Sequence, residues 1–272
     1  MGAAQTIQRL SLHGRILAEG VRCASACSDE PILCIASGQM LAFAVSSEAR
    51  LLFSWQFRLP TAIQPPIAFV IPKVIVRHLI ASPGGGEADV DLTLRGNEVT
   101  FTSRDARGPF ELRWQSDLRR FPAPMEMNRL LAVPPNLIRL DYLQLSDSIH
   151  RAVARLITLE SQQHIHRTRL ALLLSLSDGH LMVDGREISD QGAGHYYFDP
   201  RLMLRALEHV RAEQVEIGLT SLSLRRAILS IVERRPEYLL HCALMSIGLD
   251  TQLLLPPSPR RGQQAVQVRQ AS

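Results

Sequence analysis

The chain has 272 residues, of which 46% are hydrophobic and 21% are charged, and its formal net charge is +4. These fractions are typical of a globular protein with a buried core, and the length allows one large domain or two of ordinary size. No apolar run reaches the roughly 20 residues of a membrane-spanning helix, which argues against a membrane protein, and the small basic excess permits a polyanionic partner without requiring one.

The first predicted element is a helix from Gln8 to Cys27. Its inward face is apolar and consists of Leu12, Ile16, Leu17, Val21 and Ala24. Arg15 and Arg22 lie on the outward side with Glu19 between them, which tempers the positive charge. We therefore expect a helix that packs by one face and presents two arginines on the other.

Short β-like runs and one further helix follow in the first half. Strands are predicted over residues 32–36, 39–45, 51–57, 88–94, 98–103 and 110–115, and residues 60–66 are predicted as a proline-rich loop. A helix is predicted from Lys73 to Ile80, beginning just after Pro72. Lys73 and Arg77 lie four residues apart on its outward face.

The second half shows a similar series of elements. Helices are predicted from Tyr142 to Leu159, with Arg151 and Arg155 outward, and from Pro200 onward, with Asp199 as its N-cap. Strands are predicted at residues 170–176, 180–183 and 214–219, with a hairpin turn at 178–179. In the helix after Pro200, the basic pair is Arg201 and Arg205.

Two of these segments repeat one pattern about 126 residues apart, which is too long a period for a solenoid and indicates two copies of one domain. The helix at 73–80 followed by the strand at 88–94 parallels the helix at 201–208 followed by the strand at 214–219. Both helices carry a basic pair four residues apart. The repeated basic faces point to a polyanionic partner, although ordinary solvated faces remain the alternative.

Several short runs resemble the bacterial DNA polymerase sliding clamp, the beta subunit. They are Phe69-Val-Ile-Pro-Lys73, the strand at 86–94, the strand at 97–103, Arg120-Phe-Pro122 and the final strand Glu237 to Ser246. Bacterial clamps have three such domains, whereas this chain has two, as the eukaryotic and archaeal clamps do. The Met245-Ser246-Ile247 ending also lacks the usual proline. The resemblance implies an α+β fold of two tandem clamp-like domains, with helices on one face of antiparallel sheets. The expected divisions are 1–122, a connector at 123–139, 140–255, and a disordered tail at 256–272.

The function that the resemblance implies is a ring around double-stranded DNA that tethers a polymerase or another DNA enzyme. Two domains per chain then require a homotrimer. The expected DNA-binding residues are Arg15, Arg22, Lys73, Arg77, Arg151, Arg155, Arg201 and Arg205, which would contact phosphates without reading sequence. The alternative is an interaction scaffold of the same fold that does not encircle DNA.

The connector and the last strand are the expected place for partner peptides. Five apolar residues there would border a groove: Leu130, Leu131, Val133, Met245 and Ile247. By resemblance, clamps bind short polymerase motifs near this place. The simpler interpretation is that the connector's apolar residues dock on the domain beneath them.

No motif for catalysis or cofactor binding is found. The sequence has no nucleophile elbow, and Gly84-Gly-Gly86 is not followed by the lysine of a phosphate-binding loop. His164 and His166 lack further ligands at metal spacing, and the four cysteines are expected to be buried thiols of a reducing cytosol. We therefore expect no enzyme activity, cofactor or metal, and a cytoplasmic location, associated with the nucleoid in a bacterium. An enzyme with an unfamiliar motif is the third hypothesis.

Overall fold

The computed structural model describes residues 7–47, 50–81, 88–105, 108–121, 131–163, 170–177, 180–188, 196–223 and 226–247. Its elements in chain order are β1 (Ile7–His13), α1 (Gly14–Cys27), β2 (Ile32–Ser47), β3 (Leu51–Ile71), α2 (Lys73–Ala81), β4 (Asp89–Arg95), β5 (Glu98–Asp105), β6 (Gly108–Gln115), the 3-10 helix η1 (Leu118–Arg120), β7 (Ile138–Asp141), α4 (Tyr142–Gln163), β8 (Leu170–Ser177), β9 (His180–Glu187), β10 (Tyr196–Phe198), α5 (Pro200–Glu208), β11 (Gln214–Ser223), β12 (Arg226–Arg234) and β13 (Leu239–Met245).

The strands form three antiparallel sheets. Their orders are β1-β4-β5-β6, β10-β8-β9 and β2-β3-β13-β12-β11-β7. The two halves of the chain repeat one sequence of elements. In the first half β1 pairs with β4, which begins the meander β4-β5-β6. In the second half β7 pairs with β11, which begins the meander β11-β12-β13. The predicted α+β fold with antiparallel sheets is confirmed.

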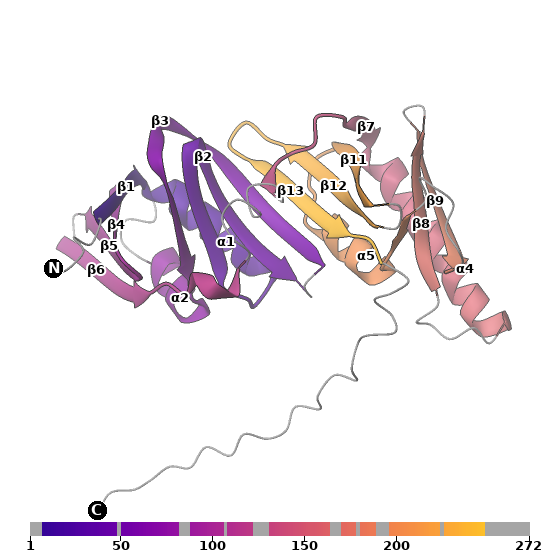
Figure 1. The fold of residues 1–272 in the computed structure, drawn as a ribbon, viewed down its shortest axis with the longest axis horizontal. Helices are drawn as coiled ribbons and strands as arrows, with labels where there is room; N and C mark the ends of the chain where they lie inside the picture. Colours follow the sequence, from indigo (N-terminus) through magenta and orange to yellow (C-terminus); the bar gives the residue numbers. More distant parts are fainter. Residues whose placement is uncertain are drawn as a thin grey trace, which may run out of the picture.

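The two halves meet where β3 pairs with β13, and we call this junction the seam. The pairing runs from Gln56 opposite Leu239 to Leu51 opposite Leu244, so that one six-stranded sheet crosses from the first half to the second (Figure 1). Along the seam the helix-side residues Phe53 and Cys242 face each other and are fully buried. The seam is therefore part of the hydrophobic core.

The helices α1, α2, α4 and α5 lie on one side of the sheets, behind them in Figure 1. Each helix buries one apolar stripe, as Leu17, Val21 and Ala24 do on α1. One continuous cluster of buried residues joins these stripes to all three sheets. Residues from all four of these helices belong to the cluster. The outward helix faces are therefore left for charged residues.

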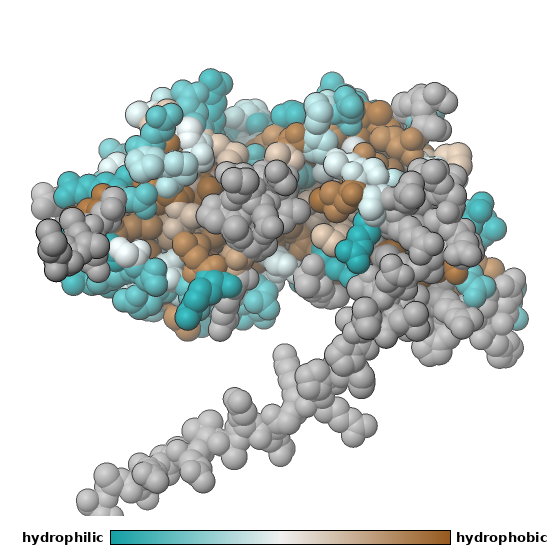
Figure 2. Space-filling view, in the orientation of Figure 1, coloured by the Kyte–Doolittle hydropathy of each residue, from teal (hydrophilic) through white to brown (hydrophobic). Residues whose placement is uncertain are grey.

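The other side of the sheets carries two smaller apolar clusters. One contains Leu33, Ile35, Val70 and Leu131, and the other is formed by Ala171, Tyr197 and Ile247. Figure 2 shows this strand side, where hydrophobic residues gather over the centre of the molecule and hydrophilic residues follow its edges. Alternate residues of β2 therefore serve two cores, one on each face of the sheet.

The prediction of a helix from Gln8 onward is wrong for its first turns. Ile7–His13 is a strand that pairs with β4, and the helix begins only at Gly14 with His13 as its N-cap. Leu10 and Leu12 alternate inward in this strand. Leu12 fits both a period of two and a period of 3.6, and pairing with β4 decides between them.

Two further boundaries differ in the first half. The predicted strands at 32–36 and 39–45 are one strand, β2, which has a register shift around Gly38 with φ of 56°. Glycine adopts this left-handed conformation without steric cost. The predicted loop at 60–66 belongs to the long strand β3, whose residues from Pro60 to Pro66 are mostly exposed and make only one pairing with β2, at Ile63.

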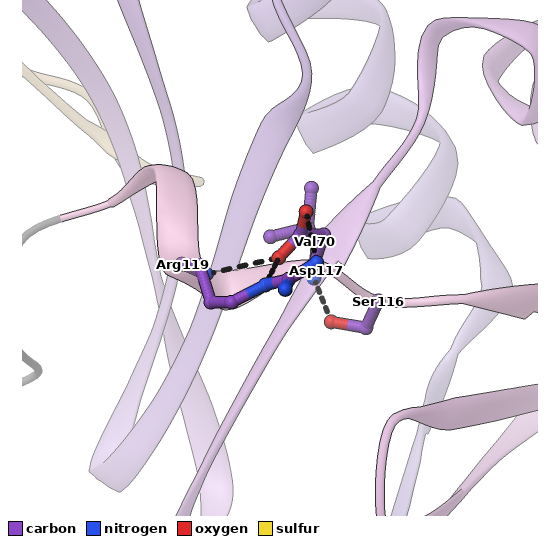
Figure 3. Close-up of polar contacts among 4 residues, drawn as sticks. All are labelled: Val70, Ser116, Asp117 and Arg119. Atoms are coloured by element: carbon purple, nitrogen blue, oxygen red, sulfur yellow. Dashed lines mark hydrogen bonds and ion pairs between the residues drawn. The ribbon is translucent and has the colours of Figure 1, made fainter.

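The side chains of Ser116 and Trp114 fasten the end of β6 to β3, and Figure 3 shows the contact of Ser116. The hydroxyl oxygen of Ser116 accepts a hydrogen bond from Val70 N at 2.8 Å, and beside it Asp117 pairs with Arg119 at 2.9 Å. Trp114 Nε1 donates to Val70 O, also at 2.8 Å. These bonds satisfy both backbone groups of a buried residue.

One backbone contact at the end of β6 recurs at the end of β13. Ser116 N donates to Asn97 O at 2.7 Å in the first half, and Ser246 N donates to Ala227 O at 2.9 Å in the second. The hydroxyl contacts differ, because Ser116 Oγ accepts from Val70 N of β3 and Ser246 Oγ accepts from Ala227 N of β12. The matching backbone bonds and the matching strand order make β6 the counterpart of β13.

Candidate nucleic-acid interface and seam

The structure places all eight predicted DNA-binding residues on the helix side of the molecule. They occur as one pair on each helix: Arg15 and Arg22 on α1, Lys73 and Arg77 on α2, Arg151 and Arg155 on α4, and Arg201 and Arg205 on α5. Seven are exposed, and Arg205 is half-buried. The eight residues therefore lie on one layer of the molecule.

Acidic partners neutralise half of these charges. Arg22 pairs with Glu19 at 2.8 Å, Arg155 with Asp184 at 2.9 Å and Arg201 with Asp199 at 3.0 Å, while Lys73 pairs with Asp29. The ammonium of Lys73 lowers the pKa of the Asp29 carboxyl, mainly through their hydrogen bond. Exposed pairs of this kind stabilise a protein by less than about 1 kcal/mol, so phosphates can compete for these side chains.

Arg205 joins the two halves on the helix side of the seam. Its guanidinium donates to Cys27 O, the last residue of α1, at 2.8 Å. A cavity of about 410 Å³ lies here, lined by residues of α1 and α5 and their ends: Ala26, Cys27, Arg201, Leu202, Arg205, Glu208 and His209. His209 also lies against Phe53, with ring centroids 4.9 Å apart, and burial lowers its pKa. His209 is therefore half-buried at the end of α5.

Large apolar side chains are also exposed on two of these helices. Val74 on α2 is 74% exposed, and Leu143 and Ile157 on α4 are 69% and 61% exposed. Residues of this kind do not bind phosphates. They show that the helix side is not uniformly basic.

The predicted partner groove is not formed as one continuous surface by its five residues. Leu131 is 1% exposed and packs between β2 and β3, whereas Ile247 is buried in the separate cluster beside Tyr197. Val133 and Met245 are half-buried, and Leu130 lies outside the described residues. Leu131 is therefore a core residue that anchors the connector, which is the simpler interpretation of its apolar character.

A different hollow lies along the connector. It measures about 430 Å³ and is lined by Val133, Pro134, Pro135, Leu137, Arg139, Glu216 and Arg234. Arg234 and Glu216 form an ion pair across it at 2.9 Å. Among the predicted groove residues that the structure describes, only Val133 belongs to this lining.

Comparisons with known proteins were decisive only at the level of three-dimensional structure. No protein-family model and no curated protein sequence matches the chain. A DNA polymerase sliding clamp of Pseudomonas aeruginosa superimposes with a TM-score of 0.59 at 15% identity, over 92% of this chain and 68% of that one. The beta subunit of DNA polymerase III of Thermotoga maritima gives 0.55 at 13% identity, with 92% and 67% covered. The Streptococcus pneumoniae beta chain gives 0.55 at 17% identity, with 91% and 66% covered.

The chain has the sliding-clamp fold. The resemblance inferred from short sequence runs is thus confirmed for the fold, at identities too low to carry residue roles across. The chain spans about two thirds of the length of these bacterial clamps.

The described residues were also compared with the requirements of a metal site and of a membrane span. Within the described ranges, no group of three or more histidine, cysteine, aspartate or glutamate side chains could hold a metal ion, and no helix has the length and hydropathy of a membrane span. His164, His166, the Asp178-Gly179 turn and the tail from 256 lie outside these ranges. The four cysteines are free thiols, three of them buried and Cys23 half-buried.

Two buried polar residues near the seam could not be identified from the sequence. Glu233 is 1% exposed, accepts a hydrogen bond from Arg211 N at 2.7 Å and is paired with Arg235. His241 is 2% exposed, and its Nε2 lies 3.0 Å from the Ser230 hydroxyl. Burial lowers the pKa of His241 to about 4, so its imidazole is neutral at pH 7. Both occupy strand positions where sequence patterns predict apolar residues.

Proposed function

We propose that the chain is a sliding clamp: two tandem clamp domains per chain, three chains per ring, duplex DNA in the hole and a polymerase or another DNA enzyme as the tethered partner. The observation that carries the proposal is that the two strands corresponding to those of the seam are unpaired edges at opposite ends of the chain. β6 is equivalent to β13, and β9 occupies in the second half the place of the first part of β3. Both β6 and β9 are end strands of their sheets.

The seam also suggests how these two edges would pair between chains. Transferring the β3·β13 register places Leu112 opposite Val183 and Trp114 opposite Leu181 of the next chain. Leu112, Leu181 and Val183 are half-buried on the helix side, where their seam counterparts are fully buried. Pairing would bury these side chains and satisfy two rows of backbone groups that are otherwise liable to aggregate.

Head-to-tail pairing of this kind is heterologous, so it forms a ring only if the rotation closes. Three chains of 30.3 kDa give a ring of about 90 kDa. The helix side, with its four basic pairs, would then line the hole. Because only backbone charge would be recognised, binding should be independent of sequence and weakened by salt.

Retention on circular DNA tests this function. We expect the chain to remain on a nicked circular duplex and to leave the same duplex after it is cut to a linear form. Neutralising Arg15, Arg77 and Arg151 to glutamine should weaken retention further as salt rises. Equal retention of the triple variant and the parent at every salt concentration would contradict DNA binding by the helix side.

The scaffold alternative is favoured by the exposed apolar residues of the helices. Val74, Leu143 and Ile157 suit a protein surface better than a phosphate backbone. A scaffold with this fold would show no difference between circular and linear DNA. The same experiment therefore separates the two functions.

A further inference from the structure

A cavity opens at the seam on the helix side, and we call it the seam pocket. It measures about 440 Å³, within the range of roughly 300–1,000 Å³ that ligand sites occupy. Its lining consists of Arg15, Ile16 and Glu19 from α1, Phe57 from β3, and Glu237 and Tyr238 from the turn before β13. Both halves of the chain therefore contribute to it.

The walls of the seam pocket are aromatic and aliphatic. Phe57 is 4% exposed, and its ring lies 6.0 Å from that of Tyr238 and 5.9 Å from that of Phe43. The turn that carries Tyr238 is held by a 2.8 Å bond from Arg235 N to Tyr238 O. Within the described part of the chain, the Tyr238 hydroxyl makes no hydrogen bond, so it is available to a ligand.

The charge of the seam pocket is opposite to that of the chain. Its lining holds two carboxylates against one guanidinium, although the net charge of the protein is +4. Glu19 is paired with Arg22 at 2.8 Å, whereas Glu237 is exposed and has no ion pair among the described residues. Burial raises the pKa of Tyr238, Glu233, Cys23 and Glu19 raise it further, and the guanidinium of Arg235 lowers it.

The fold does not require this pocket. At the counterpart edge of the molecule, Leu143 occupies the place of Arg15, Glu187 that of Phe57 and Gly108 that of Tyr238. These three residues offer no aromatic pair. The aromatic walls of the pocket are therefore a property of the sequence at the seam.

We propose that the seam pocket binds an arginine or lysine side chain presented by a peptide segment of a partner protein. Ile16 and Phe57 would contact the aliphatic stem, the Tyr238 ring would lie against the charged group, and the exposed Glu237 would neutralise it. Such a ligand matches both the apolar walls and the acidic rim. DNA matches neither, so the proposal stands apart from the DNA function.

Calorimetric titration of the full chain with two peptides tests this proposal. The probe is acetyl-Ser-Leu-Arg-Leu-Ser-amide, and its twin carries glutamate in place of the arginine. We expect the arginine peptide to bind and the glutamate peptide not to bind. Glu237→Lys should weaken the arginine peptide at least about tenfold, since it replaces an attraction with a repulsion.

The matched control is Glu213→Lys, which changes an equally exposed glutamate outside the lining and should leave the affinity unchanged. No binding of the arginine peptide, equal binding of both peptides, or equal affinity in the Glu237→Lys variant would each overturn the proposal. No DNA is present in the titration. Its result is therefore independent of whether the ring forms.

Discussion

The indole Nε1 of Trp114 donates a hydrogen bond to the carbonyl oxygen of Val70 at 2.8 Å, and this bond connects two different sheets of the first half. Trp114→Phe leaves a buried carbonyl without its donor and should lower the free energy of unfolding by about 1–3 kcal/mol. Urea denaturation measures the change. Trp55→Phe is the control, because Trp55 is also buried but makes no hydrogen bond among the described residues. A similar loss in both variants would show that ring volume is the cause.

Glu233 should stabilise the second half more than any exposed carboxylate does. Glu233→Ala removes the acceptor of Arg211 N and the partner of Arg235 from a buried site, which should cost roughly 3 kcal/mol. Glu216→Ala, which breaks the exposed pair with Arg234, should cost less than about 1 kcal/mol. Thermal or urea unfolding of both variants gives the comparison, and equal losses would contradict a structural role for Glu233.

His241 should make the protein less stable as the solution becomes mildly acidic. Its pKa is about 4 in the folded chain against 6.5 as its ordinary value. The unfolded chain therefore binds the proton first, and stability is full above pH 6.5 and falls as the pH decreases toward 4. The whole effect is up to roughly 3 kcal/mol.

Urea denaturation at pH 7 and pH 5 checks the effect of His241. His241→Gln should reduce the difference between the two pH values, whereas His150→Gln, at an exposed position of α4, should not. A parent protein whose stability does not change between these pH values would contradict the buried neutral imidazole.

Leu131 should behave as an anchor of the connector. Its side chain packs in the strand-side cluster, and its carbonyl oxygen accepts a 2.8 Å bond from Gln56 Nε2. Leu131→Ala should therefore lower the free energy of unfolding by about 2–5 kcal/mol. The half-buried Val133→Ala should lower it by less. If both changes were nearly neutral, Leu131 would instead be a wall of an open partner groove, as the sequence suggested.

The proposed edge pairing predicts which residues meet between chains. Transferring the seam register places Arg113 of β6 opposite Met182 of β9 on the strand side, where both are exposed. Cysteines at these two positions should form disulfides between chains under mild oxidation, since opposite Cβ atoms in such a pair lie about 4.5–5.5 Å apart. Non-reducing gels would show products of up to three chains.

The native thiols should not interfere with this crosslink. Burial raises the pKa of Cys23 and of Cys27 to about 12, and Cys34 and Cys242 are fully buried. The control pair joins the Arg113 position to Leu222, which is exposed on β11 away from the β9 edge, and should give no defined product. Equal crosslinking of both pairs would mean random collision.

Local chemistry explains which parts of the fold were predictable. The N-cap at Asp199 and the first-turn Pro200 of α5 are as predicted, with the Asp199 carboxylate accepting from Arg201 N at 2.9 Å. Capping involves neighbouring residues only, so sequence suffices. Leu12 illustrates the opposite case, because its place in β1 depends on pairing with β4, distant in the chain.

The candidate sites were predictable only in part. Helical periodicity predicts outward positions for the eight basic residues, and seven of them are exposed, whereas Arg205 is half-buried against Cys27. Their ion pairs do not follow, because Asp29 and Asp184 come from other elements. The seam pocket could not be predicted from the sequence either, because only the pairing of β3 with β13 brings Phe57 and Tyr238 together.

The central claim is that β6 and β9 join three chains into a ring, and the mass in solution tests it most directly. Light scattering at micromolar concentration and physiological salt should give about 90 kDa, three times the 30.3 kDa chain. Ser116 N donates toward β5, so the N–H of Arg113, three residues earlier in the alternating strand, faces the free edge. Replacing Arg113 with proline removes this edge N–H and should reduce the mass toward that of one chain. A mass near 30.3 kDa for the parent protein, unchanged as its concentration rises, would contradict the ring.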